Sequence, residues 1–128
     1  MLSISRDIAA PPEDAWALLV DTAAWPTWGP SIRRAELDGT EFGVGATGRV
    51  WTAVGLPLRF VVTECEAGRA WAWSVAGVRA TRHRVEATDL GCRVTFAVPW
   101  WAPAYLLVCA VALRRIDDLL HGDGGGRA

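Results

Sequence analysis

The chain has 128 residues, of which 52% are hydrophobic and 21% charged, and its formal net charge is −1. This length predicts one domain, and this composition excludes a disordered chain. All thirteen cations are arginines that are spread along the sequence, which argues against nucleic acid as a partner because phosphate binding requires clustered cations.

Cysteine usage favours the cytoplasm. The three cysteines are an odd number without CxxC spacing and are interpreted as reduced thiols: Cys65, Cys92 and Cys109. The first residues lack a cationic segment followed by an apolar one, so no signal peptide is expected. The two histidines and the scattered acids show no metal-ligand spacing, and we expect no metal and no cofactor.

The N-terminal third predicts one strand followed by short helices. Residues 2–9 alternate between apolar and polar side chains, as a half-buried strand does. Residues 11–14, Pro-Pro-Glu-Asp, begin a short helix with proline and acids in its first turn. Asp21 can cap a second short helix that ends near Pro26.

The middle of the chain predicts an antiparallel meander. Glycine- or proline-containing connections separate short segments of strand character. The predicted strands span residues 31–37, 48–54, 58–66, 69–76, 79–88 and 91–98.

The last long segment, from Pro103 to Leu120, has helical periodicity. One mostly apolar face of this segment carries Leu106, Ala110, Leu113, Asp117 and Leu120, and is widened by Cys109 and Ile116. Gly122 is a suitable helix stop, so residues 1–121 are expected to form the domain and residues 122–128 a flexible tail. Twenty uncharged residues precede Arg114, but two prolines divide them, and we expect no membrane span.

Tight hairpins fix strand register, which allows one face of the sheet to be projected. The projection pairs Trp51 with Phe60 and Val62 with Trp73. It places Glu64 and His83 on the two sides of Trp71, and Phe96 beside His83. One predicted face carries Arg49, Trp51, Phe60, Val62, Trp71, Trp73, Thr81, His83, Val85, Val94 and Phe96. A slip of one residue at a hairpin would exchange the faces of its strand. This aromatic face should meet the long helix.

The order of elements and two motifs resemble a known superfamily. Residues 8–19, IAAPPEDAWALL, are similar to the opening "I-x-A-P-x-E-x-V-W-x-x-L" of the START-like (SRPBCC) superfamily. Residues 21–32, DTAAWPTWGPSI, are similar to its "D-x-x-x-W-P-x-W-x-P-x-I", and Gly43-Val44-Gly45 resembles the glycine turn before its third strand. The nearest branch is polyketide cyclase/dehydrase.

The resemblance implies an α+β helix-grip fold. In that fold a curved antiparallel sheet of about seven strands wraps around a long C-terminal helix, with two short helices after the first strand. It also implies an apolar cavity between sheet and helix for lipids, sterols or polyketides. Some members cyclise aromatic polyketides.

The candidate ligand-binding residues combine the projected face with the helix stripe. They are Trp28, Trp51, Phe60, Trp71, Trp73, Thr81, His83, Phe96, Leu106, Ala110 and Leu113. The alternative is that the tryptophans, eight in all, fill the space themselves.

Two inward polar residues are candidate catalytic groups. His83 could act as a general acid or base, or it could be a core histidine bonded to Thr81 or Asp117. Arg49 could stabilise an enolate, or it could pair with a carboxylate such as Glu64 or Asp117, or lie at a strand edge with its head in water.

Three functions remain open at this stage. The first is binding of a small hydrophobic ligand that is aromatic, polyketide-like or lipid-like. The second is a polyketide cyclase/aromatase that uses His83 and Arg49. The third is a protein- or membrane-interaction module that presents Trp100 and Trp101. The sequence leaves open whether the chain is an enzyme, and whether it is a monomer or a homodimer.

Overall fold

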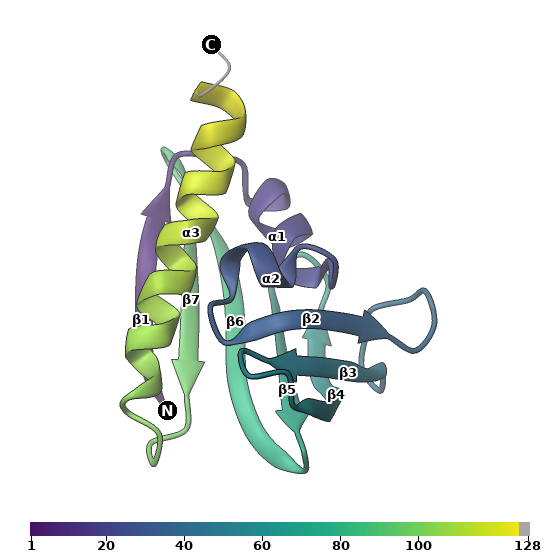
Figure 1. Ribbon diagram of the computed structural model, residues 1–128. Coiled ribbons are helices and arrows are strands. Elements are labelled where there is room, and N and C mark those ends of the chain that lie inside the picture. The colour runs from purple at the N-terminus through teal and green to yellow at the C-terminus, as the bar shows by residue number, and fades with distance from the viewer. Residues whose placement is uncertain (126–128) are drawn as a thin grey trace.

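The computed structural model describes residues 1–125 and shows a curved sheet that lies against one long helix (Figure 1). The seven antiparallel strands have the order β1-β7-β6-β5-β4-β3-β2. The strands are β1 (Leu2–Ile8), β2 (Ile32–Leu37), β3 (Thr47–Thr52), β4 (Pro57–Glu66), β5 (Ala70–Val75), β6 (Val78–Thr88) and β7 (Gly91–Val98). The helices are α1 (Pro12–Val20), α2 (Trp25–Trp28) and α3 (Tyr105–Gly125). The predicted helix-grip architecture is confirmed.

Helix α3 lies along β1 and β7 and continues past α2, whereas β2 and β3 run across the other end of the concave face (Figure 1). Its buried side chains are Cys109, Ala112, Leu113 and Ile116, so the buried face is rotated from the predicted stripe and leaves Leu106 and Ala110 half-buried. The helix continues to Gly125, so the predicted stop at Gly122 is wrong. The remainder of the predicted tail, 126–128, lies outside the described residues. No helix within residues 1–125 is long and apolar enough to cross a membrane.

The sequence predicted a second short helix that ends near Pro26, but helix α2 begins there, at Trp25. Pro26 occupies its first turn, where a missing backbone N–H leaves no hydrogen bond unmade. Asp21 caps only a turn, by accepting the Ala23 N–H at 3.0 Å. The indoles of Trp25 and Trp28 donate to the Leu19 and Leu18 carbonyls at 2.9 and 3.0 Å. These bonds satisfy carbonyls at the end of α1 and fix α2 against it.

The predicted register between β3 and β4 is wrong, and the error exchanges the two faces of β3. Phe60 lies opposite Gly48, not Trp51, and Arg49 lies opposite Arg59. The connection is longer than predicted, because residues 52–56 close a turn in which the Thr52 hydroxyl accepts the Leu56 N–H. The observed pairing of β3 with β4 differs from the predicted pairing by an odd number of residues. Arg49 and Trp51 therefore lie on the outer face of the sheet and Val50 on the inner face.

The later hairpins follow the prediction more closely. Trp71 pairs with His83 and His83 with Phe96, as projected. Between β4 and β5, Val62 pairs with Trp73 as predicted, but a bulge after Val62 places Cys65, not Glu64, opposite Trp71. The inner face from β5 to β7 therefore carries the aromatic residues that the sequence placed there.

Gly48 supplies a stability test of the corrected register. A Cβ at this position would collide with the Glu36 carbonyl oxygen and with the Phe60 ring. Gly48→Ala should therefore lower the free energy of unfolding by roughly 1–3 kcal/mol in urea titrations. Gly43→Ala is the control, because no atom lies within 4 Å of its Cβ, and it should change stability by less than about 0.5 kcal/mol. Equal effects of the two substitutions would contradict the register.

Candidate functional site

Three rings form a stack at the centre of the concave face. Trp25 of α2 lies parallel to Trp71 of β5, with ring centroids 5.4 Å apart and planes 7° apart. Trp71 in turn stacks on His83 of β6 at 4.0 Å and 19°. All three side chains are buried, so the stack joins α2 to the middle of the sheet.

Further aromatic rings pack edge-on around this stack. Phe42 meets Trp71 at 4.9 Å and 84°, and Phe96 meets His83 at 4.9 Å and 80°. The space that remains beside the stack has a volume of about 30 Å³, which is room for about one water molecule. The tryptophans therefore fill the part of the concave face where the sequence analysis placed a ligand. Sequence reasoning did not assign Trp25 and Phe42 to this cluster.

His83 is held as a neutral ring by a chain of hydrogen bonds. Its Nδ1 lies 3.3 Å from the Trp71 carbonyl oxygen, which can only accept, so Nδ1 carries the proton. Its Nε2 then accepts from the Thr81 hydroxyl at 3.1 Å, and this hydroxyl accepts the Trp73 indole N–H at 2.9 Å. Burial lowers the pKa of His83 to about 3, although the Trp71 carbonyl opposes this shift. At neutral pH the ring is uncharged.

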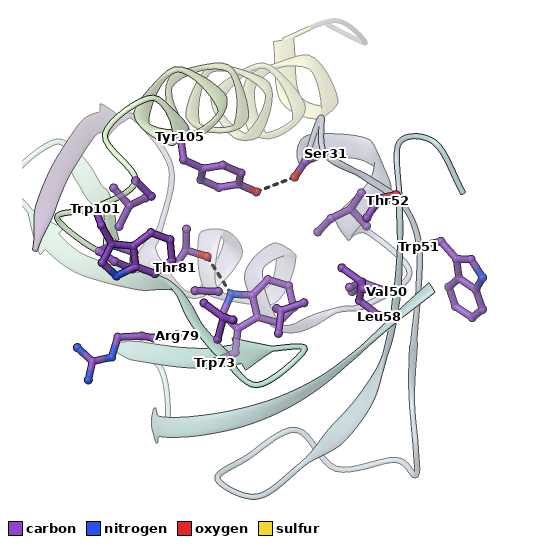
Figure 2. A pocket seen from close by; sticks show the side chains of 17 residues that line it. Ser31, Val50, Trp51, Thr52, Leu58, Trp73, Arg79, Thr81, Trp101 and Tyr105 are labelled. Atoms are coloured by element: carbon purple, nitrogen blue, oxygen red, sulfur yellow. Dashed lines mark hydrogen bonds between the residues drawn. The ribbon is translucent and has the colours of Figure 1, made fainter. Parts of the chain in front are cut away.

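A second, mostly apolar cavity lies beyond Trp73, at the end of the sheet where α3 begins (Figure 2). Its volume is about 340 Å³, within the range of roughly 300–1,000 Å³ found for ligand pockets. Its walls are mostly apolar and come from β2 to β7, from the segment before α3 and from the first residue of α3. The lining residues are Ser31, Ile32, Val50, Trp51, Thr52, Leu58, Trp73, Val75, Val78, Arg79, Ala80, Thr81, Val98, Pro99, Trp101, Ala102 and Tyr105.

Only part of the predicted ligand set reaches this cavity. Trp73, Thr81 and Trp51 border it, but Figure 2 shows the Trp51 ring turned away from the space. The other aromatic candidates and His83 pack within the core instead: Trp28, Phe60, Trp71 and Phe96. Leu113 is also in the core, and Leu106 and Ala110 do not line the cavity.

Arg49, the predicted enolate-stabilising cation, lies outside the concave face. Its guanidinium and that of Arg34 approach the Trp51 ring to 5.7 and 4.7 Å from the centroid, as cation–π contacts do. The cyclase hypothesis requires Arg49 and His83 to face one space, and they do not. Sequence reasoning missed Ser31 and Tyr105, although Tyr105 is the only tyrosine in the chain.

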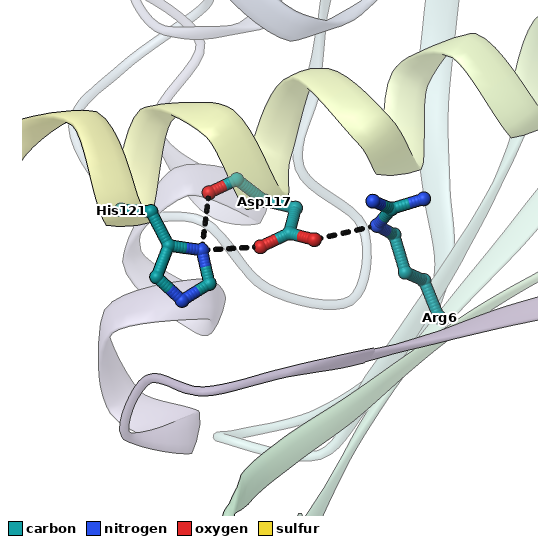
Figure 3. A network of polar contacts seen from close by, with 3 residues as sticks. All are labelled: Arg6, Asp117 and His121. Carbon is teal, nitrogen blue, oxygen red and sulfur yellow. Dashed lines mark hydrogen bonds and ion pairs between the residues drawn. The ribbon is translucent and has the colours of Figure 1, made fainter.

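Asp117, a predicted partner of His83 or Arg49, binds neither residue. Figure 3 shows it between Arg6 of β1 and His121 on the next turn of α3. Its carboxylate oxygens lie 2.6 Å from Arg6 Nε and 2.5 Å from His121 Nδ1. The Asp117 side chain is only 14% exposed, so this ion pair ties α3 to the edge strand of the sheet. Among the side chains that the structure describes, those of residues 1–121, no three histidine, cysteine or acidic groups converge as a metal site would require.

Comparison with known proteins identifies the family. The profile of the family described as polyketide cyclase/dehydrase and lipid transport matches residues 2–122. The chain belongs to this family. This membership confirms the resemblance to the START-like superfamily. A search of curated proteins found no match to this chain.

Solved structures share the fold of this family member at low sequence identity. A Nitrosomonas europaea protein is 16% identical with a TM-score of 0.73, and the match covers 96% of this chain and 95% of that one. The Aha1 dimer from Colwellia psychrerythraea is 18% identical, with a TM-score of 0.69 and coverage of 93% and 94%. A Rhodobacter sphaeroides protein is 21% identical, with a TM-score of 0.67 and coverage of 94% and 90%. These likenesses support the helix-grip fold.

The buried neutral His83 predicts a pH-dependent stability. Its pKa is about 3 in the folded chain and about 6.5 when unfolded, so between these values the unfolded state binds more protons. The free energy of unfolding should fall as the pH is lowered from 7 to 5, with a slope that approaches about 1.4 kcal/mol per pH unit. His83→Gln should remove most of this slope in urea titrations. Equal slopes in both proteins would contradict a buried, neutral His83.

Proposed function

We propose that this protein binds a small hydrophobic molecule in the 340 Å³ cavity between the sheet and the first turn of α3. The single observation that carries the proposal is the cavity itself, since its walls are mostly apolar in a domain whose core is otherwise filled. Burying the apolar surface of a ligand there would supply about 25 cal/mol per Å². Membership of a family described by polyketide and lipid chemistry supports the same class of ligand.

The arrangement of the side chains favours binding over cyclase chemistry. His83 does not line the cavity, and both ring nitrogens are already hydrogen-bonded. A pKa of about 3 also makes His83 a poor general base at neutral pH. Arg49 lies on the outer face of β3. The proposed role is therefore that of a carrier or sensor of an apolar molecule.

A cavity-filling substitution tests this proposal with an uncharged fluorescent probe, N-phenyl-1-naphthylamine. The wild type should bind the probe saturably, with one site per chain. Ala80 lines the cavity, and Ala80→Phe should weaken binding at least about tenfold because the new ring occupies the probe's space. Ala72 does not line the cavity and pairs with Arg82 on the outer face, so Ala72→Phe is the matched control and should bind as the wild type does.

Binding that never saturates, or that is the same in all three proteins, would place the probe on the surface instead of in the cavity. Thermal melts of the three proteins, recorded without probe, show whether each variant is folded at the titration temperature.

A further inference from the structure

Two hydroxyls bind each other on one side of the cavity. Ser31, in the loop before β2, and Tyr105, the first residue of α3, have their hydroxyl oxygens 2.7 Å apart. Figure 2 shows this pair facing the cavity from the side opposite Trp73. Either hydroxyl can donate to the other. Because two hydroxyls carry two protons and their mutual bond uses one, one O–H remains free in either arrangement.

The other polar groups of the cavity wall differ from this pair. The Thr81 hydroxyl is fully engaged, since it accepts from Trp73 and donates to His83. The Thr52 hydroxyl accepts the Leu56 backbone N–H of the adjacent turn and keeps its own O–H, so the double variant described below also tests whether Thr52 supplies the donor instead. Arg79 is the only charged residue of the lining, and Figure 2 shows its guanidinium pointing away from the space. Neither hydroxyl of the Ser31–Tyr105 pair has another hydrogen-bond partner within residues 1–121, and the pair is exposed to solvent at the edge of the cavity.

We infer that the ligand is an uncharged apolar molecule with an acceptor oxygen, such as a ketone, and that this oxygen accepts the free O–H of the Ser31–Tyr105 pair. The inference rests on the proposed binding function and specifies its ligand class. A charged group would lose its hydration against these apolar walls without a counter-charge facing it. Burial raises the pKa of Tyr105, so its phenol keeps its proton near neutral pH.

The pair of hydroxyls predicts an unusual pattern among variants. Removing one hydroxyl leaves the other unpaired and still able to donate to the ligand. Tyr105→Phe and Ser31→Ala should therefore each keep part of the preference for an acceptor oxygen, and only the double variant should lose it. A site with one essential donor would lose the whole preference in one of the single variants.

The test compares two rigid probes that differ at one position, fluorenone with its ketone and fluorene with a methylene. Equilibrium dialysis gives both dissociation constants for the wild type, both single variants and the double variant. The wild type should bind fluorenone about 3- to 10-fold more tightly than fluorene, which is the contribution of one neutral hydrogen bond. In the double variant this ratio should fall to about 1, while fluorene binding stays unchanged.

Ser5→Ala is the matched control, because it removes a hydroxyl from the Ser5–Thr95 pair, whose oxygens are 2.8 Å apart in residues that do not line the cavity. It should keep the wild-type ratio. Equal binding of both probes by the wild type, or a ratio that survives in the double variant, would overturn the inference and leave the binding function standing. If the wild type binds neither probe and also fails to bind N-phenyl-1-naphthylamine, the binding function itself is wrong.

Discussion

The parallel stack of Trp25, Trp71 and His83 is the interaction on which the rest of the structure depends. It fills the centre of the concave face, and it connects α2 to the sheet through buried rings. The hydrogen bonds of His83 to the Trp71 carbonyl and to Thr81 hold the third ring of the stack in place. Because a neutral imidazole satisfies all of these partners, the stack can be buried without an uncompensated charge.

The stack also decides where a ligand can bind. Beside it there is space for about one water, whereas beyond Trp73 the same concave face opens into about 340 Å³. Trp73 separates these regions and donates its indole N–H to Thr81, which completes the hydrogen-bond chain from His83. On the stack side the hydrogen bonds of Trp73, Thr81 and His83 form a complete chain, although the buried Trp71 indole N–H has no partner among the described residues. On the cavity side the Ser31–Tyr105 pair keeps one O–H outside its mutual bond.

Much of the fold follows from sequence patterns, and much of the site does not. Period-two alternation places Trp71 and His83 on the inner face, as predicted. Their pairing depends also on a bulge between Ala72 and Ser74, which shifts the register set by the turn at Val75 and Val78. The turn before β4 could not be predicted, because its length depends on a Thr52 side-chain hydrogen bond, and an odd error moved Arg49 to the wrong face. Tyr105 lies before the periodic part of α3, where no pattern indicates its direction. The cavity arises from packing that leaves space between elements, and no local pattern encodes such a space.

The central claim is that the ring stack excludes ligand from the middle of the concave face and confines it to the end near Tyr105. Intermolecular NOEs between bound N-phenyl-1-naphthylamine and valine methyl groups test this claim most directly. Val75 and Val98 line the cavity, whereas Val85 and Val94 lie in the filled core beside the stack. The account predicts NOEs only to the valines that line the cavity, which are Val50, Val75, Val78 and Val98. NOEs to Val85 and Val94 would contradict it, because the probe would then occupy the space assigned to the rings.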